Sequence, residues 1–129
     1  MHKSLVDSMI EQLRTNQASV FHDEKTELLT VNDEYTVSLV LARCRTTHSG
    51  NKHWTVRFDS AYQPDITIAA RLNAENESIT DYYIVPRIAD AGESMRLTDH
   101  NPLSLDVFRF EDLSFFSTIA KRVSVEEVT

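Results

Sequence analysis

The stretch 42-ARCRTTHSGNKHWTVRF-58 decides how the middle of this 129-residue chain folds. It holds the only cysteine and the only tryptophan, and it contains no acidic residue although the chain has a formal charge of −7. Residues 53–58 alternate apolar and polar side chains, which is typical of a strand with one buried face. Residues 34–45 end in a similar alternation. The stretch therefore predicts a β-hairpin closed by the loop 46–52.

The remaining elements follow from the same kind of periodicity. Residues 3–16 have apolar side chains at helical spacing. Further strands are predicted at 26–31, 65–72 and 79–87, with a short sixth strand at 105–110 and a helix at 111–122. Short connections indicate antiparallel neighbours, because a parallel crossover needs a dozen or more residues. We expect an α+β fold: an antiparallel meander of five or six strands flanked by an N-terminal and a C-terminal helix.

Length and composition indicate the class of protein. A chain of 129 residues, 41% hydrophobic and 26% charged, is expected to form a single globular domain over residues 1–129. The lone cysteine excludes an intramolecular disulfide and suits a reducing compartment. Neither a signal-peptide core nor an apolar run of membrane-spanning length is present. We expect a cytoplasmic protein with no membrane segment.

Metal and cofactor chemistry finds little support in the sequence. Cys44, His48 and His53 have ligand-like spacing, but a structural zinc site needs a fourth ligand and none lies near. Strand alternation puts Cys44 on an apolar face, where a cysteine acts as a small hydrophobic residue. Two glycines in the whole chain argue against a phosphate-binding loop. We expect no cofactor.

Pro64-Asp65 raises the question of a metal-dependent nuclease. Nucleases of the PD-(D/E)xK type need an aspartate and then an acidic-x-Lys triplet on a neighbouring strand, where the carboxylates hold Mg²⁺. After Asp65 the chain offers 69-AAR-71, and Glu27 in the first hairpin is followed by no such triplet either. We expect Pro64-Asp65 to begin a strand. Enzyme activity stays open, and the residues favour a protein that is not an enzyme.

Arginine is the strongest functional signal, with nine Arg against four Lys. Alternation places Arg43 and Arg45 on one face of their strand and His53 and Arg57 on one face of the next. A guanidinium group binds phosphate or carboxylate through forked contacts, and an exposed tyrosine beside arginine can stack on bases. We expect a binding face made of Arg43, Arg45, Lys52, His53, Arg57, Arg71, Tyr83 and Arg87. The alternative is a solvated face balanced by Glu34, Asp59, Glu75 and Asp81.

Four segments of the sequence carry a resemblance to a known domain: 64-PDIT-67, 81-DYYIVP-86, 105-LDVFRF-110 and 115-FF-116. Over residues 40–122 the chain resembles a small domain associated with bacterial serine-type recombinase-like proteins. The recombinase catalytic domain itself is absent. The resemblance therefore implies a DNA transaction in which this domain is an accessory or recognition module, and it transfers no catalytic residue.

Two functions are consistent with these patterns. In the first, the protein binds DNA or a DNA-associated protein through the arginine-bearing sheet face. In the second, its acidic surface engages a basic, nucleic-acid-binding protein as an interaction or inhibitor module. An exposed edge strand would also allow a homodimer.

Overall fold

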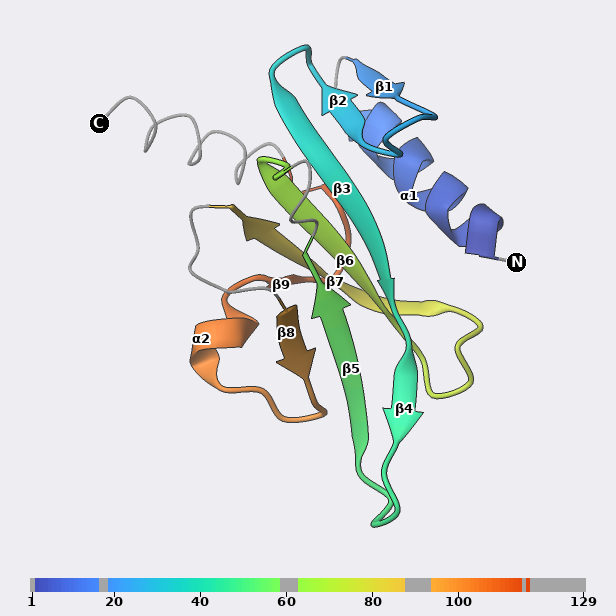
Figure 1. Ribbon diagram of the computed structural model, residues 1–129, viewed down its shortest axis with the longest axis vertical. Helices are drawn as coiled ribbons and strands as arrows, with labels where there is room; N and C mark the ends of the chain where they lie inside the picture. Colours follow the sequence, from blue (N-terminus) through green and yellow to red (C-terminus); the bar gives the residue numbers. More distant parts are fainter. Residues whose placement is uncertain (1, 17–18, 59–62, 88–93, 115, 117–129) are drawn as a thin grey trace.

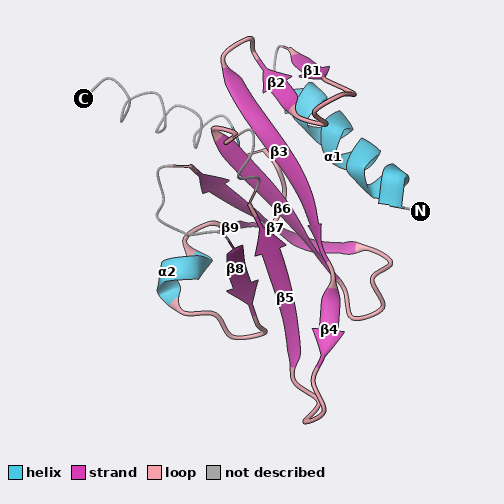
Figure 2. Ribbon diagram, viewed as in Figure 1, coloured by secondary structure: helices cyan, strands magenta, loops and turns pink. Residues whose placement is uncertain are grey.

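Two sheets pack face to face, and the N-terminal helix covers the other face of the larger sheet (Figure 1). The computed structural model describes residues 2–16, 19–58, 63–87, 94–114 and 116. The helices are α1 (His2–Asn16) and the short α2 (Leu103–Asp106). The larger sheet has the order β1 (Val20–His22), β2 (Leu29–Val31), β3 (Tyr35–Ala42), β6 (Ile66–Leu72), β7 (Ile79–Pro86) and β9 (Arg109–Phe110). The smaller sheet has the order β4 (Cys44–Thr46), β5 (Lys52–Arg57) and β8 (Ser94–Leu97), and Figure 2 distinguishes these strands from the helices.

The predicted antiparallel meander is wrong. Strands β3 and β6 pair in parallel, with Val37 opposite Ile66 and Ala42 opposite Arg71. The chain between them, residues 43–65, is long enough for a parallel crossover. It makes that crossover through the β4–β5 hairpin, which belongs to the smaller sheet. The predicted strand 34–45 is accordingly two strands, since β3 ends at Ala42 and β4 begins at Cys44 in a different sheet.

The flanking helices are also only partly as predicted. Helix α1 is present, but residues 111–114 form bends and a turn where a second long helix was predicted to begin. Apart from Phe116, which is buried, the rest of the predicted helix 111–122 lies outside the described residues. The predicted strand 105–110 keeps only its last two residues as β9, because Leu105 and Asp106 end helix α2.

The first core fills the space between α1 and the larger sheet. Met9, Ile10 and Leu13 of the helix are buried against alternate residues of the strands, such as Ile66 and Ile68 of β6. The spacing of three and four along the helix places its three side chains on one face. The apolar stripe of α1 therefore packs on the sheet, as the sequence predicted.

The second core lies on the opposite face of the same sheet. Ala69, Tyr83 and Val85 pack there against residues of the smaller sheet, including Trp54 and Leu97. Because both of its faces are covered, every residue of β6 is buried. A strand in this position has no exposed side, so its polar residues must find partners inside the protein.

Asp65 joins the beginnings of the two parallel strands. Its Oδ2 accepts hydrogen bonds from the backbone N–H of Thr36 at 2.9 Å and from the Thr36 hydroxyl at 3.2 Å. In return, the Thr36 Oγ1 accepts a hydrogen bond from the Asp65 N–H at 3.1 Å. Pro64-Asp65 directly precedes β6, which begins at Ile66, one residue later than predicted, and the Asp65 carboxylate supports the pairing of β3 with β6.

The edges of the sheets are β1 and β9 in the larger and β4 and β8 in the smaller. Phe21 on β1 is 63% exposed. A second copy of the chain pairing with one of these edges stays a prediction.

Candidate functional site

The outer face of the smaller sheet is the strongest candidate site. Cys44, Trp54 and Leu97 are opposite one another in the register and are buried toward the larger sheet. Alternation turns the intervening residues outward. The outward pairs are Arg45 with His53, Thr55 with Arg96, and Arg57 with Ser94.

We define the arginine face as Arg43, Arg45, Arg57 and Arg96, with His53 among them. All four arginines are exposed, and His53 is half-buried. No residue of β4, β5 or β8 is acidic. Within the described residues, no ion pair involves Arg45, Arg57 or Arg96. The charge on this face is therefore unusual for a chain of net charge −7.

An open groove of about 610 Å³ runs over this face. It is lined by Val40, Leu41, Arg43, Arg45, Thr55 and Arg57. Three of the predicted binding residues therefore share one surface. Guanidinium groups in this arrangement present forked donors to an extended anion such as a phosphate backbone.

The β4–β5 hairpin, whose strands include Arg45, His53 and Arg57, extends away from the body of the molecule (Figure 1). Its predicted turn is confirmed, with the Thr47 N–H donating to the Asn51 carbonyl at 2.8 Å and the Gly50 N–H donating to the Thr47 carbonyl at 3.0 Å. Gly50 has φ +88°, a left-handed conformation that glycine adopts without steric cost. At the base of the hairpin, the Cys44 N–H donates to Asn76 Oδ1 at 2.7 Å. Both ends of the hairpin are thus fixed.

Arg71, which the sequence placed on the open face, is in the interior. It is 9% exposed, and its guanidinium bonds to Asp81, with Nε 2.9 Å from Oδ1 and Nη2 2.6 Å from Oδ2. Its Cζ also lies 4.9 Å from the centre of the Trp54 ring. Arg71 therefore holds the two sheets together and cannot contact a partner.

Tyr83 and Arg87 also lie away from the arginine face. Tyr83 is fully buried, and burial raises the pKa of its phenol, partly opposed by the nearby Arg71 charge. Arg87 lies at the other end of β6, where its N–H donates to the Asp65 carbonyl at 2.8 Å. Its Nη2 lies 3.7 Å from Asp65 Oδ1. Neither residue extends the face, and Tyr83 offers no ring for base stacking.

Arg96 was missed by sequence reasoning. It lies between the predicted strands 79–87 and 105–110, where no element was predicted. The signal was the alternation in 94-SMRL-97, where Met95 and Leu97 are buried and Ser94 and Arg96 are exposed. Four residues of alternation are too few to distinguish an edge strand from a loop.

Lys52 and His53 contribute to a different depression, on the flank of the hairpin. His53 points to the opposite face of the sheet from Cys44, since the two residues differ by one step in the register. The Cys44, His48 and His53 spacing therefore does not converge on a point. Among the described residues, no group of three or more His, Cys, Asp or Glu side chains is arranged to hold a metal ion.

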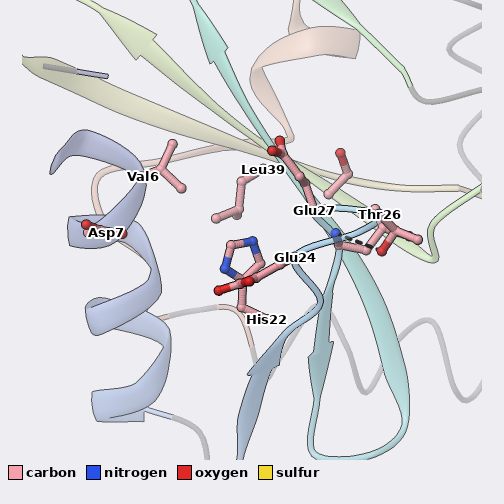
Figure 3. Close-up of a pocket in the computed structure, with 9 residues that line it drawn as sticks. Val6, Asp7, His22, Glu24, Thr26, Glu27 and Leu39 are labelled. Carbon is pink, nitrogen blue, oxygen red and sulfur yellow. Dashed lines mark hydrogen bonds between the residues drawn. The ribbon is translucent and has the colours of Figure 1, made fainter. Parts of the chain in front are cut away.

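An acidic pocket of about 620 Å³ lies on the other side of the molecule, between α1 and the β1–β2 hairpin. Figure 3 shows the His22 ring beside the Glu24 carboxylate, with Asp7 on the facing helix. Its remaining lining residues are Val6, Thr26, Glu27, Leu28, Ser38 and Leu39. Ser38 and Leu39 belong to β3, and no lysine is among the described residues that line the pocket. The acidic-x-Lys triplet beside this pocket, Asp23-Glu24-Lys25, lies in the turn between β1 and β2 and not on a strand.

Neither helix of the described chain has the length and apolar character needed to cross a membrane.

Comparison with known proteins shows the fold. No family model matches the chain, and no curated protein matches it. Among solved structures, the chain is similar to a bacterial homing endonuclease, I-Ssp6803I, with a TM-score of 0.56 and 16% sequence identity. The match covers 93% of this chain and 88% of that one. The comparisons thus point to the fold of an endonuclease and not to a recombinase-like domain.

Proposed function

We propose that the arginine face binds DNA and that the protein is a non-enzymatic accessory or recognition module in a DNA transaction. The observation that carries this proposal is the gathering of three exposed arginines, Arg45, Arg57 and Arg96, on a sheet whose strands hold no carboxylate, with the exposed Arg43 directly before the first of these strands. In a chain with 20 acidic and 13 basic residues, such a surface is a local exception to the overall charge.

The geometry suits a phosphate backbone. His53 and Arg57 are four residues apart on β5, and a strand rises by about 3.3 Å per residue, so their backbones are about 13 Å apart. Arg45 and Arg96 flank β5 on either side through their register partners. The positive charge therefore extends both along β5 and across to its neighbouring strands, so that several phosphates can be contacted at once.

The fold supports a nucleic-acid context. The similar structure is named as a homing endonuclease, and an endonuclease acts on nucleic acid. We do not extend cleavage to this chain, since the acidic-x-Lys triplet next to the acidic pocket, Asp23-Glu24-Lys25, lies in a turn, whereas a nuclease of the type considered carries it on a strand. The proposal is accordingly recognition.

Fluorescence anisotropy with a labelled duplex tests the proposal. Affinity should fall with salt, and Arg45→Ala and Arg57→Ala should each lower the slope of log K against log salt by about one. Arg14→Ala is the matched control, because Arg14 is an exposed arginine on α1. Absence of binding at low salt, or equal losses in the control, would overturn the proposal.

A second function is favoured by the acidic pocket. Asp7, Glu24 and Glu27 surround a concavity that a lysine or arginine of a basic protein would fit. On that interpretation the protein is an interaction or inhibitor module. Glu24→Gln and Glu27→Gln should then release a co-purifying basic protein, while arginine-face variants should retain it.

A further inference from the structure

The depression that Lys52 and His53 line has a volume of about 590 Å³ and lies between the turn of the β4–β5 hairpin and the segment that follows β8. We call it the hairpin cup. Its lining residues are Thr47, Ser49, Asn51, Lys52, His53, Arg96, Thr98, Asp99 and His100. Each of them carries a polar group, so the cup has the composition of a site for a polar or charged ligand.

The charges of the cup favour an anion. Lys52 and Arg96 are both exposed and carry permanent positive charges, whereas Asp99 is the single carboxylate of the lining. A lysine and an arginine together supply a point charge and a forked donor, the combination that binds tetrahedral oxyanions. Histidine rings at positions 53 and 100 add further potential donors.

The hairpin wall of the cup is held in place by its own hydrogen bonds. The hydroxyls of Thr47 and Ser49 lie 3.0 Å apart, and the Asn51 Nδ2 donates to Ser49 Oγ at 3.3 Å. Only one hydroxyl hydrogen is used between Thr47 and Ser49, so the other remains for a ligand.

The opposite wall is fixed to the protein interior. The Thr98 N–H donates to Asn101 Oδ1 at 2.8 Å, and the Thr98 hydroxyl donates to the His100 carbonyl at 2.9 Å. The Thr98 carbonyl accepts a hydrogen bond from Arg71 Nη1 at 2.9 Å. The wall is thereby tied to the buried Arg71–Asp81 pair, and the cup needs little rearrangement to bind.

One buried atom of a cup residue has no hydrogen-bond partner. His53 Nδ1 is buried and has no hydrogen-bond partner among the described residues. Buried polar atoms in native proteins are almost always paired with protein, water or an ion. His53 is also a lining residue of the cup, so the ring that holds this unpaired atom belongs to its wall.

We propose that the hairpin cup binds one phosphate group. Arg96 and His53 belong to both the cup and the arginine face, so a phosphate of DNA lying on that face can enter the cup. That source rests on the proposed function. A free phosphate or a phosphate monoester offers the same chemistry and does not depend on it.

The test is a titration of the ¹⁵N-labelled protein with sodium phosphate, followed by backbone amide shifts and compared with sodium chloride at equal ionic strength. Shifts should be confined to residues 47–53 and 96–100. Lys52→Ala and Arg96→Ala should each weaken phosphate binding about fivefold or more, since each removes a charged donor. Asp99→Asn should tighten it. The matched controls are Lys25→Ala in the β1–β2 connection and Arg14→Ala on α1, which should bind as the wild type does.

A second titration, with a short DNA duplex, identifies the source. If the amides of the cup shift with DNA and phosphate competes, the phosphate comes from the DNA backbone. If they shift with phosphate alone, the source is a free phosphate or monoester.

Amide shifts that are no larger with phosphate than with chloride would overturn the cup as a site. Amide shifts spread over all basic residues would overturn it as well. Failure of the duplex to bind anywhere would overturn the proposed function and leave the phosphate titration as an independent result.

Discussion

Arg71 and Asp81 lie directly opposite each other on β6 and β7 and join through two hydrogen bonds, Nε to Oδ1 at 2.9 Å and Nη2 to Oδ2 at 2.6 Å. Asp81 is completely buried, and its Oδ2 also accepts a hydrogen bond from Arg109 Nε at 2.6 Å. One carboxylate therefore connects β6, β7 and β9. Arg71 extends the connection to the smaller sheet through Trp54.

Removing the carboxylate should strongly destabilise the fold. Asp81→Ala leaves the Arg71 charge buried without its partner, and breaking a buried pair in this way costs about 3–5 kcal/mol of unfolding free energy. Urea denaturation measures the loss. The control Glu11→Ala breaks an exposed pair with Arg14 and should cost less than about 1 kcal/mol. A loss for Asp81→Ala as small as that of the control would contradict the role we assign to the pair.

Trp54 should contribute through its indole N–H as well as its ring. The Nε1 donates to the Leu72 carbonyl at 2.8 Å, which ties β5 to the end of β6. Trp54→Phe keeps most of the apolar contact but leaves that carbonyl unpaired, so we expect a loss of about 1–3 kcal/mol in thermal or urea unfolding.

The matched control for Trp54 is Phe21→Leu, because Phe21 is 63% exposed and its truncation should change stability little. Equal losses in the two variants would show that the indole hydrogen bond contributes nothing.

Tyr83 should make stability depend on alkaline pH. Burial raises the pKa of its phenol above the ordinary tyrosine value of about 10, so the folded state favours the neutral form. The stability that this preference contributes is fully present below the unfolded-state pKa and is lost as pH rises through the higher folded-state pKa. Urea denaturation at increasing pH above about 9 should show the wild type losing stability faster than Tyr83→Phe.

Tyr83→Phe also removes the hydrogen bond that Asn101 Nδ2 donates to the hydroxyl at 3.1 Å. This loss is present at neutral pH and is subtracted by measuring both proteins there. Parallel pH profiles for the two proteins would be inconsistent with titration of Tyr83.

Arg96 and Arg87 should differ in DNA binding although both are exposed arginines. Arg96 belongs to the arginine face, so Arg96→Ala should raise the Kd for a duplex about 3- to 10-fold, equivalent to about 0.7–1.4 kcal/mol. Arg87→Ala should leave the Kd unchanged, since its side chain is held by Asp65 and by the Gln63 carbonyl at the far end of β6. Anisotropy at low salt compares them. Equal effects would mean that general charge, and not this face, determines binding.

How far the sequence predicts the fold is clearest at β3 and β4. The alternation of 34–45 is correct in both strands, and so are the hairpin at 46–52 and the burial of Cys44 and Trp54. Alternation does not reveal that the chain changes from one sheet to the other at Arg43, because buried and exposed side chains continue to alternate across this residue. The parallel pairing of β3 with β6 follows from that change and was missed for the same reason.

The candidate site shows a similar limit at Arg71. Alternation placed the Arg71 side chain on the other face of β6 from Leu72 and Ala70, which is correct. The smaller sheet, however, covers that face. A strand buried on both faces has no solvent side, and this depends on residues far away in the chain. Arg43, Arg45 and Arg57 were predicted to lie together because they come from one local hairpin.

The anchoring of α1 has a consequence for how the chain folds as it is made. Gln12 donates a hydrogen bond to the Tyr82 hydroxyl at 2.6 Å, 70 residues later, and accepts one from the Leu113 N–H, 101 residues later. At a synthesis rate of about 5–20 residues per second, the last of these partners emerges roughly 5–20 s after the helix. During that interval the apolar stripe of α1 lacks part of its docking surface, and contacts of such long range also slow folding itself. During synthesis this nascent helix therefore exposes apolar side chains that a chaperone can cover.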